Sequence, residues 1–110
     1  MKARVEDFLS LDIRCGTIVE AAPLDGARKP ALRLTVDFGG EIGLRGSSAQ
    51  ITQLYAPERL IGRQVLAVVN FPPRRVAGFV SQVLVLGLYG PEGVVLIGPE
   101  RQVPNGCKLG

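Results

Sequence analysis

The chain has 110 residues and a formal net charge of +3 at pH 7, and it contains neither histidine nor tryptophan. Its 46% hydrophobic and 21% charged residues exclude a disordered protein, and its length predicts one domain over residues 1–110. No apolar run approaches the roughly 18 residues of a membrane span, and the acidic N-terminal stretch is unlike a signal peptide. The distant Cys15 and Cys107 fit a reduced compartment, while a single disulfide stays open as an alternative. We therefore expect a cytoplasmic protein without membrane insertion.

The N-terminal half of the chain predicts a short helix and then three strands. Residues 5–12 read as the helix, because their apolar residues fall at i, i+3 and i+4 on one face. Residues 13–24 read as a strand that ends at Pro23, and a loop with turn residues Asp25-Gly26 follows. Residues 32–38 alternate between apolar and polar side chains, which predicts a strand with one buried face.

The pairing of this strand with the next one can be argued from its apolar face. A two-residue turn at Gly39-Gly40 would set Val36 opposite Gly43, so that the apolar faces of the two strands would not match. A three-residue loop over 39–41 pairs Val36 with Leu44, and we prefer this register. It places four residues on the outer, polar face: Arg33, Thr35, Arg45 and Ser47.

The C-terminal half of the chain adds further strands and no long helix. The expected elements are a short helix over 48–62 broken near Pro57, a strand at 63–71, a loop at 72–79, strands at 81–89 and 94–98, and an extended tail at 99–110. Five or more strands in a chain of this length indicate an all-β protein. We predict a five-stranded Greek-key barrel of the OB type, with short helices, an N-terminal helical turn and an extended C-terminal tail.

The sequence lacks the residue types on which most enzymatic chemistry depends. Without histidine there is no Ser-His nucleophile pair and no usual zinc ligand, and the acidic residues are scattered rather than paired. The stretch around Gly39-Gly40 is not a phosphate-binding loop, because it joins two strands and lacks the lysine of that motif. We therefore expect no enzyme, no catalytic residue, no metal and no cofactor.

Basic residues suggest a binding surface instead. Arg28-Lys29 precede the second strand and Arg74-Arg75 follow the fourth, while Arg33 and Arg45 lie between them in the preferred register. Together they could form one positive surface across the second and third strands, where OB folds usually bind ligands. The alternative is that each pair is simply solvated in its loop.

The stretch "VNFPPRRVAGFVS" at residues 69–81 carries most of the candidate binding residues. Pro72 and Pro73 cannot donate to a strand ladder, so they end the strand and stiffen the loop. Phe71 and Phe79 are the only aromatic candidates near the positive surface, and Phe79 reads either as core or as a contact residue. Asn70 either ties down the following loop or faces a ligand.

Three segments are more apolar than a barrel strand with one wet face requires. They are "VLAVVNF", "VLVLGLY" and "VVLI". The surplus suggests that one outer surface is covered by a second copy of the chain.

At this point the sequence resembles a known family. The segments "DFLSLDIRCGTI", "ARKPALRLTVDFGGEIGLRGSSAQIT", "LIGRQVLAVVNFPPRRVAGFVSQVLVLG" and "VPNGCKLG" are together similar to the CsaA-type chaperones. These belong to the tRNA-binding-domain OB family, which includes the C-terminal domain of bacterial methionyl-tRNA synthetase. The resemblance covers residues 8–110.

The resemblance implies a homodimer held by the N-terminal turn and the C-terminal tail. It also implies binding of unfolded polypeptides or preproteins and a link to Sec-dependent export, with the Sec translocase motor as a further partner. For peptide binding we select Phe71, Pro72, Arg74, Arg75, Arg45, Ser47 and Ser48.

Binding of tRNA through the same basic surface is the alternative function. Lys29 matches the lysine that the wider family carries before its second strand, and Ser81 matches the first position of its S-x-G-M pattern. The remainder of that pattern is replaced, because Val83 and Leu84 stand in place of glycine and methionine. These departures favour peptide over tRNA. For RNA binding we select Arg28, Lys29, Arg33, Arg74 and Ser81.

Overall fold

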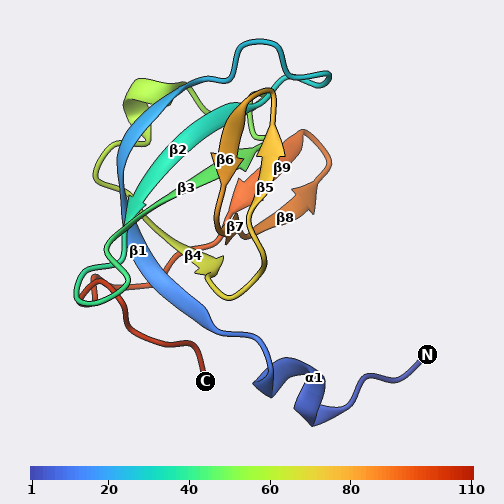
Figure 1. The fold of residues 1–110 in the computed structure, drawn as a ribbon, viewed down its shortest axis with the longest axis vertical. Coiled ribbons are helices and arrows are strands. Elements are labelled where there is room, and N and C mark those ends of the chain that lie inside the picture. The colour runs from blue at the N-terminus through green and yellow to red at the C-terminus, as the bar shows by residue number, and fades with distance from the viewer.

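Five strands wrap into a nearly closed barrel in the computed structural model, which describes all of residues 1–110 (Figure 1). The elements are α1 (Val5–Leu9), β1 (Ile13–Pro23), β2 (Leu32–Asp37), β3 (Leu44–Ala49), the 3-10 helix η1 (Pro57–Arg59), β4 (Gln64–Val68), β5 (Arg74–Val76), β6 (Phe79–Ser81), β7 (Leu84–Val85), β8 (Gly87–Gly90) and β9 (Gly93–Leu96). The barrel sheet has the order β3-β2-β1-β4-β7. This confirms the predicted all-β, OB-type fold.

The long strand β1 organises the barrel because it pairs with three partners. Residues 17–23 pair with β2, and residues 13–17 pair with β4 on the other edge. The C-terminal tail then lies beside the first half of β1, where Arg14 and Lys108 form a bridge. The Cys15 N–H donates to the Cys107 carbonyl at 2.9 Å in the same ladder. Both cysteines are free thiols.

Aliphatic side chains from every part of the barrel fill its core. Phe38 is the only aromatic ring among the fully buried residues, and Ile18, Leu34 and Leu60 pack in the same cluster. Gly16 allows this packing, since a Cβ at that position would lie 2.6 Å from Cγ1 of Val36. A larger residue there would collide with the side chains of Val36 and Phe38 in the core.

The preferred register of the β2–β3 hairpin is wrong by one residue. Val36 pairs with Arg45 and Leu34 with Ser47, because the connection is longer than three residues. The Phe38 N–H bonds to the Gly43 carbonyl at 3.0 Å, and Gly39, Gly40 and Gly43 all adopt positive φ. The shift turns Ser47 into the core, fully buried, and leaves Leu44 exposed. Apolar matching alone therefore misplaced this strand.

The helix expected over residues 48–62 does not form. Residues 48 and 49 continue β3, residues 52–54 are a turn, and only η1 is helical. Burial decides the outcome, because Ile51 and Leu60 reach the core from irregular backbone.

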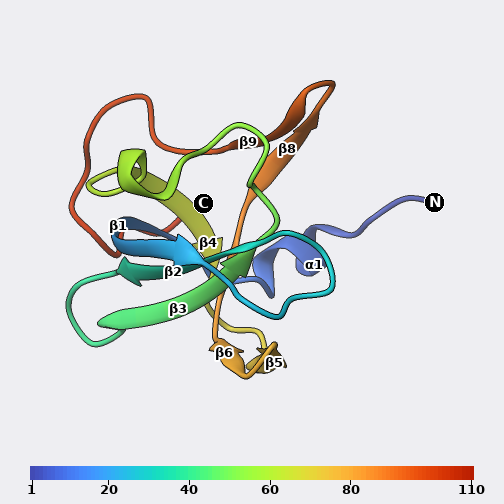
Figure 2. The same cartoon turned by 90° about the horizontal axis from the view of Figure 1, so that it is seen from above.

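The loop expected over residues 72–79 contains a β-hairpin. Strands β5 and β6 pair Arg74 with Ser81 and Val76 with Phe79, around a two-residue turn at Ala77-Gly78. Both turn residues have positive φ, 51° and 80°, as in the tight turns that suit the twist of a hairpin. Figure 2 shows this hairpin and the β8–β9 hairpin projecting from the barrel in different directions.

The two ends of the chain lie outside the barrel. The N-terminal helix α1 forms where predicted, and its residues bury no side chain. It projects beside the tail in Figure 1. No helix of the structure has the length and apolar character needed to cross a membrane.

Candidate functional site

A groove of about 1290 Å³ opens on the side of the barrel where β3 and β7 face each other. One wall is the β5–β6 hairpin with the segment before it, and another is the loop between β1 and β2. The tip of the hairpin approaches that loop, since a Cβ added to Gly26 would lie 3.8 Å from Cβ of Ala77. The volume exceeds the roughly 300–1,000 Å³ of typical small-molecule pockets, which favours a polymer as ligand.

Most of the residues selected from the sequence meet in this groove. They are Arg28, Lys29, Ser48, Phe71, Pro72, Arg74, Arg75 and Ser81. The residues selected for peptide and those selected for RNA therefore line one shared surface rather than two separate ones.

Three selected residues do not line the groove. Ser47 is fully buried and its hydroxyl donates to the Ser48 carbonyl at 3.1 Å, so the predicted outer position is wrong. Arg45 sits half-buried near the start of β3, on the same face as Val36 and not on the polar face. Arg33 is exposed on β2, opposite Ser48 in the ladder, but outside the groove lining.

The groove is lined by cations without counter-charges. Its lining contains Arg28, Lys29, Arg74 and Arg75 and no aspartate or glutamate. The two ion pairs of the structure lie elsewhere, at Arg14–Asp12 and Arg101–Glu100. A groove of one sign attracts carboxylates, phosphates or the negative ends of carbonyl dipoles. More than half of its lining, 13 of 24 residues, is hydrophobic, so it also accepts apolar side chains.

Two serine hydroxyls lie where direct rungs of a β3–β7 ladder would be expected. The Ser48 N–H donates to Oγ of Ser81 at 3.0 Å, and that hydroxyl donates to the Val83 carbonyl at 3.4 Å. The Val85 N–H is directed at Oγ of Ser47 at 3.5 Å, and that hydroxyl donates to the Ser48 carbonyl. Each hydroxyl accepts a hydrogen bond from one backbone N–H and donates one to a backbone carbonyl, in place of a direct bond between those two backbone groups. Ser81 therefore holds the barrel together, and it presents little surface to a ligand, being 7% exposed.

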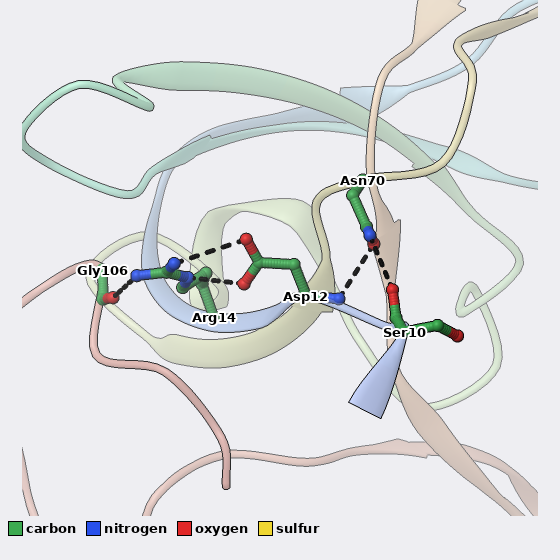
Figure 3. Close-up of polar contacts among 5 residues, drawn as sticks. All are labelled: Ser10, Asp12, Arg14, Asn70 and Gly106. Atoms are coloured by element: carbon green, nitrogen blue, oxygen red, sulfur yellow. Dashed lines mark hydrogen bonds and ion pairs between the residues drawn. The ribbon is translucent and has the colours of Figure 1, made fainter. Parts of the chain in front are cut away.

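Asn70, the residue before Phe71, is held by two hydrogen bonds to the N-terminal segment (Figure 3). Oδ1 of Asn70 accepts from the Asp12 N–H, and its Nδ2 donates to the Ser10 carbonyl, both at 2.9 Å. Asn70 thus ties the N-terminal segment to the end of β4 and does not bond to the following loop. Phe71 comes next and stays 42% exposed in the groove.

A second polar contact joins the two chain ends at the same place (Figure 3). Nε of Arg14 lies 2.6 Å from Oδ1 of Asp12, and its guanidinium also donates to the Gly106 carbonyl at 3.1 Å. The hydrogen bond from Arg14 lowers the pKa of the Asp12 carboxyl, and the same bond raises the pKa of Arg14. Burial raises the pKa of the neighbouring Cys15 thiol.

The sequence reasoning missed the apolar base of the groove. Ile51, Val85, Leu86 and Val94 line it, whereas Tyr89, which also lines the groove, is 98% exposed. The signal for Val85, Leu86 and Val94 was the apolar surplus of residues 81–98, which we assigned to a second copy of the chain; Ile51 lies outside that stretch. Phe79 is half-buried, with its ring against Gly46, where an added Cβ would lie 2.9 Å from Cζ. No cluster of three or more Cys, Asp or Glu side chains with the spacing of metal ligands occurs.

The barrel and its basic groove define an OB-type binding domain, and comparison with known proteins identifies its family. The family described as "Putative tRNA binding domain" matches residues 13–108, so the chain belongs to the tRNA-binding-domain family.

Two solved structures of chaperones are similar over the whole chain. Chaperone CsaA from Bacillus anthracis is 55% identical with a TM-score of 0.92, and the match covers 100% of both chains. The CsaA chaperone protein from Picrophilus torridus is 44% identical with a TM-score of 0.93, covering 99% of this chain and 100% of that one.

Among curated proteins the chain is similar to part of an enzyme. Methionine--tRNA ligase from Methanothrix thermoacetophila is 39% identical over 104 residues, which are 94% of this chain. The match spans only 15% of that relative's length.

Proposed function

We propose that the protein is a chaperone that binds unfolded polypeptide segments in the groove. The observation that carries this proposal is the groove itself, where an apolar base lies between two cationic lips with no acidic residue in its lining. Similarity to two proteins named CsaA chaperones supports it. Phe71 and Pro72 supply an apolar wall that costs little entropy to order, because Pro72 and Pro73 stiffen the segment.

The test is a titration of a fluorescent unfolded peptide against the protein and two variants. Phe71→Ala should weaken binding by about tenfold, as expected when an exposed aromatic contact is removed from an interface. Leu44→Ala is the control, since Leu44 is 58% exposed but lies outside the groove. The same variants should rank alike in suppressing aggregation of a denatured client. Equal affinity of all three proteins would rule the groove out as the binding site.

We also propose that the protein works as a homodimer in the cytoplasm and presents preproteins to the Sec translocase motor. Exposed apolar residues on α1 and the tail support a dimer, with Val5 71%, Leu9 67% and Leu109 39% exposed. Arg14 bonds to the tail and Asn70 bonds to Ser10 after α1, so both segments are attached near the start of β1. Co-purification of the motor with the tagged protein, in the presence of a preprotein, tests the export role.

Binding of tRNA is a second candidate function, favoured by the unpaired cations of the groove and by the family to which the chain belongs. Affinity for tRNA should then fall steeply with salt, because each phosphate contact releases counterions. Lys29→Glu should reduce the affinity strongly at low salt, whereas Arg59→Glu on the exposed η1, outside the groove, should not. Absence of a tRNA complex at low salt would remove this candidate.

A further inference from the structure

The groove begins where the barrel stops being closed by backbone hydrogen bonds. The Gly46 carbonyl accepts from the Gln82 N–H at 2.8 Å and from the Val83 N–H at 3.2 Å. After this point no backbone bond joins β3 to β7. Oγ of Ser47 accepts from the Val85 N–H of β7, and Oγ of Ser81 links the Ser48 N–H of β3 to the Val83 carbonyl just before β7. The contacts advance in the same direction along both segments, so β3 and β7 run parallel where they separate.

Backbone groups on both sides of this separation lack a backbone partner. Gln50, directly after β3, is exposed, and neither its N–H nor its carbonyl makes a hydrogen bond within the chain. The Val85 N–H points toward β3, where its single contact is the 3.5 Å approach to Ser47. The N–H and carbonyl of one strand residue point to the same side, so the Val85 carbonyl also faces the gap. Both residues line the groove.

We propose that the groove takes its ligand as an added strand, in which an extended polypeptide pairs through its main chain with the open ends of β3 and β7. This inference rests on the proposed chaperone function and specifies its substrate class. Clients are then extended segments with free amide N–H groups, whose main-chain hydrogen bonds supply the affinity. The apolar base receives alternate side chains, and the cationic lips contact outward carbonyls or carboxylates. A nucleic acid lacks the alternating N–H and carbonyl groups that these edges match.

The test compares two backbones that carry identical side chains. The parent is an apolar ten-residue peptide, and its analogue has three consecutive central amides replaced by esters. The esters remove three N–H donors without adding bulk. Strand addition predicts a loss of affinity of about tenfold or more, since several hydrogen bonds are lost. A scrambled peptide of the same apolar composition should bind within about threefold of the parent, because its main chain and the apolar character of its side chains are unchanged.

The outcomes separate the inference from the function on which it rests. If the parent binds but the ester analogue loses less than tenfold, or the scrambled peptide loses more than threefold, strand addition is wrong and the chaperone proposal stands. If the parent does not bind at all, both fail.

A variant of the protein tests the same pairing by removing a backbone N–H from the groove instead of from the peptide. Gln50→Pro removes the backbone N–H at this position, and the preceding Ala49 is already in the extended conformation that a following proline requires. Gln50→Ala is the matched control, because it keeps the N–H. Only the proline variant should have a lower affinity for the parent peptide. Circular dichroism first checks that this variant folds. If it does not fold, the peptide comparison decides.

Discussion

At the scale of single residues, the chemistry of the groove depends on groups that are held in place rather than on groups that react. Ser81 shows this, since its hydroxyl accepts from the Ser48 N–H of β3 and donates to the Val83 carbonyl before β7, while 7% of its surface is exposed. The sequence identified the residue but assigned it to RNA. A hydroxyl within reach of two backbones satisfies both of them before it can serve a ligand.

Replacement of Ser81 by alanine should therefore lower stability more than it lowers binding. The Ser48 N–H and the Val83 carbonyl would lose their relay, and unsatisfied buried polar groups cost about 1–3 kcal/mol. Urea unfolding of Ser81→Ala should show a loss of that size. Ser48→Ala, which removes only a 3.4 Å contact between two hydroxyls, is the control. Equal losses in both variants would contradict the relay.

The ion pair between Asp12 and Arg14 predicts a dependence of stability on pH. The folded-state pKa of Asp12 lies below its ordinary value of 3.8, so the pair stabilises the fold above that value and loses its effect as the pH falls through the folded-state pKa. The stability difference between the protein and Asp12→Asn should be present at neutral pH and should vanish in acid below 3.8. Thermal unfolding across this range measures it, and a constant difference would contradict the assignment.

At the scale of elements, the β5–β6 hairpin turns a stretch of charged loop into a wall of the groove. It places Arg74 and Arg75 beside the groove opening, with only three residues in each strand. Ala77 adopts a φ of 51° in its turn, a conformation that costs an ordinary residue about 1–2 kcal/mol.

Asparagine tolerates this conformation better than alanine, and Asn-Gly is the preferred sequence for such a turn. Ala77→Asn should therefore raise the free energy of unfolding by about 0.5–1 kcal/mol. It should also slow amide exchange in β5 and β6. Ala77→Val is the opposing variant and should destabilise the hairpin, because a β-branched residue fits positive φ poorly. A destabilising effect of asparagine would contradict the strain at Ala77.

Sequence reasoning recovered the barrel better than its connections. Strands such as β1 and β4 were placed correctly because burial gives them a simple pattern, and Pro23 marks an end. The β2–β3 register failed because the positive-φ glycines Gly39 and Gly43 allow a longer connection that no apolar pattern reveals. The β5–β6 hairpin was missed for a related reason: its strands are too short and too charged to alternate visibly. The groove residues were found largely because charged residues and prolines are conspicuous in the sequence. Ser47 was placed on the outer face because the predicted register was wrong.

At the scale of the whole molecule, several apolar residues outside the groove are exposed and would be stabilised by contact with a partner. The helix α1 lies outside the barrel in Figure 1, and its apolar residues Val5, Phe8 and Leu9 are exposed. The β8–β9 hairpin adds Leu88 and Val95, which are 60% and 39% exposed. A second copy of the chain is the occupant that we propose for α1 and the tail.

The proposed dimer predicts that Leu9→Asp shifts the protein toward monomers. A charge in an apolar contact should weaken association by more than about tenfold. Light scattering after size-exclusion chromatography, over a dilution series, measures the shift. Val80→Asp places the same charge at an exposed valine of β6, outside α1 and the tail, and should leave the mass unchanged. An unchanged mass for Leu9→Asp would remove α1 from the interface.

The pairing of the tail with β1 also bears on the order in which the protein assembles. The bridge between Arg14 and Lys108 closes a loop that includes almost the whole barrel, and such distant contacts form late because their entropy cost comes first. Until the tail arrives, the first half of β1 has an open edge, which is a template for pairing with another molecule. The tail therefore covers the last open strand edge of the barrel. If the tail detached transiently, the first half of β1 would expose unpaired backbone groups that can pair with another molecule, while the remainder of the protein stayed folded.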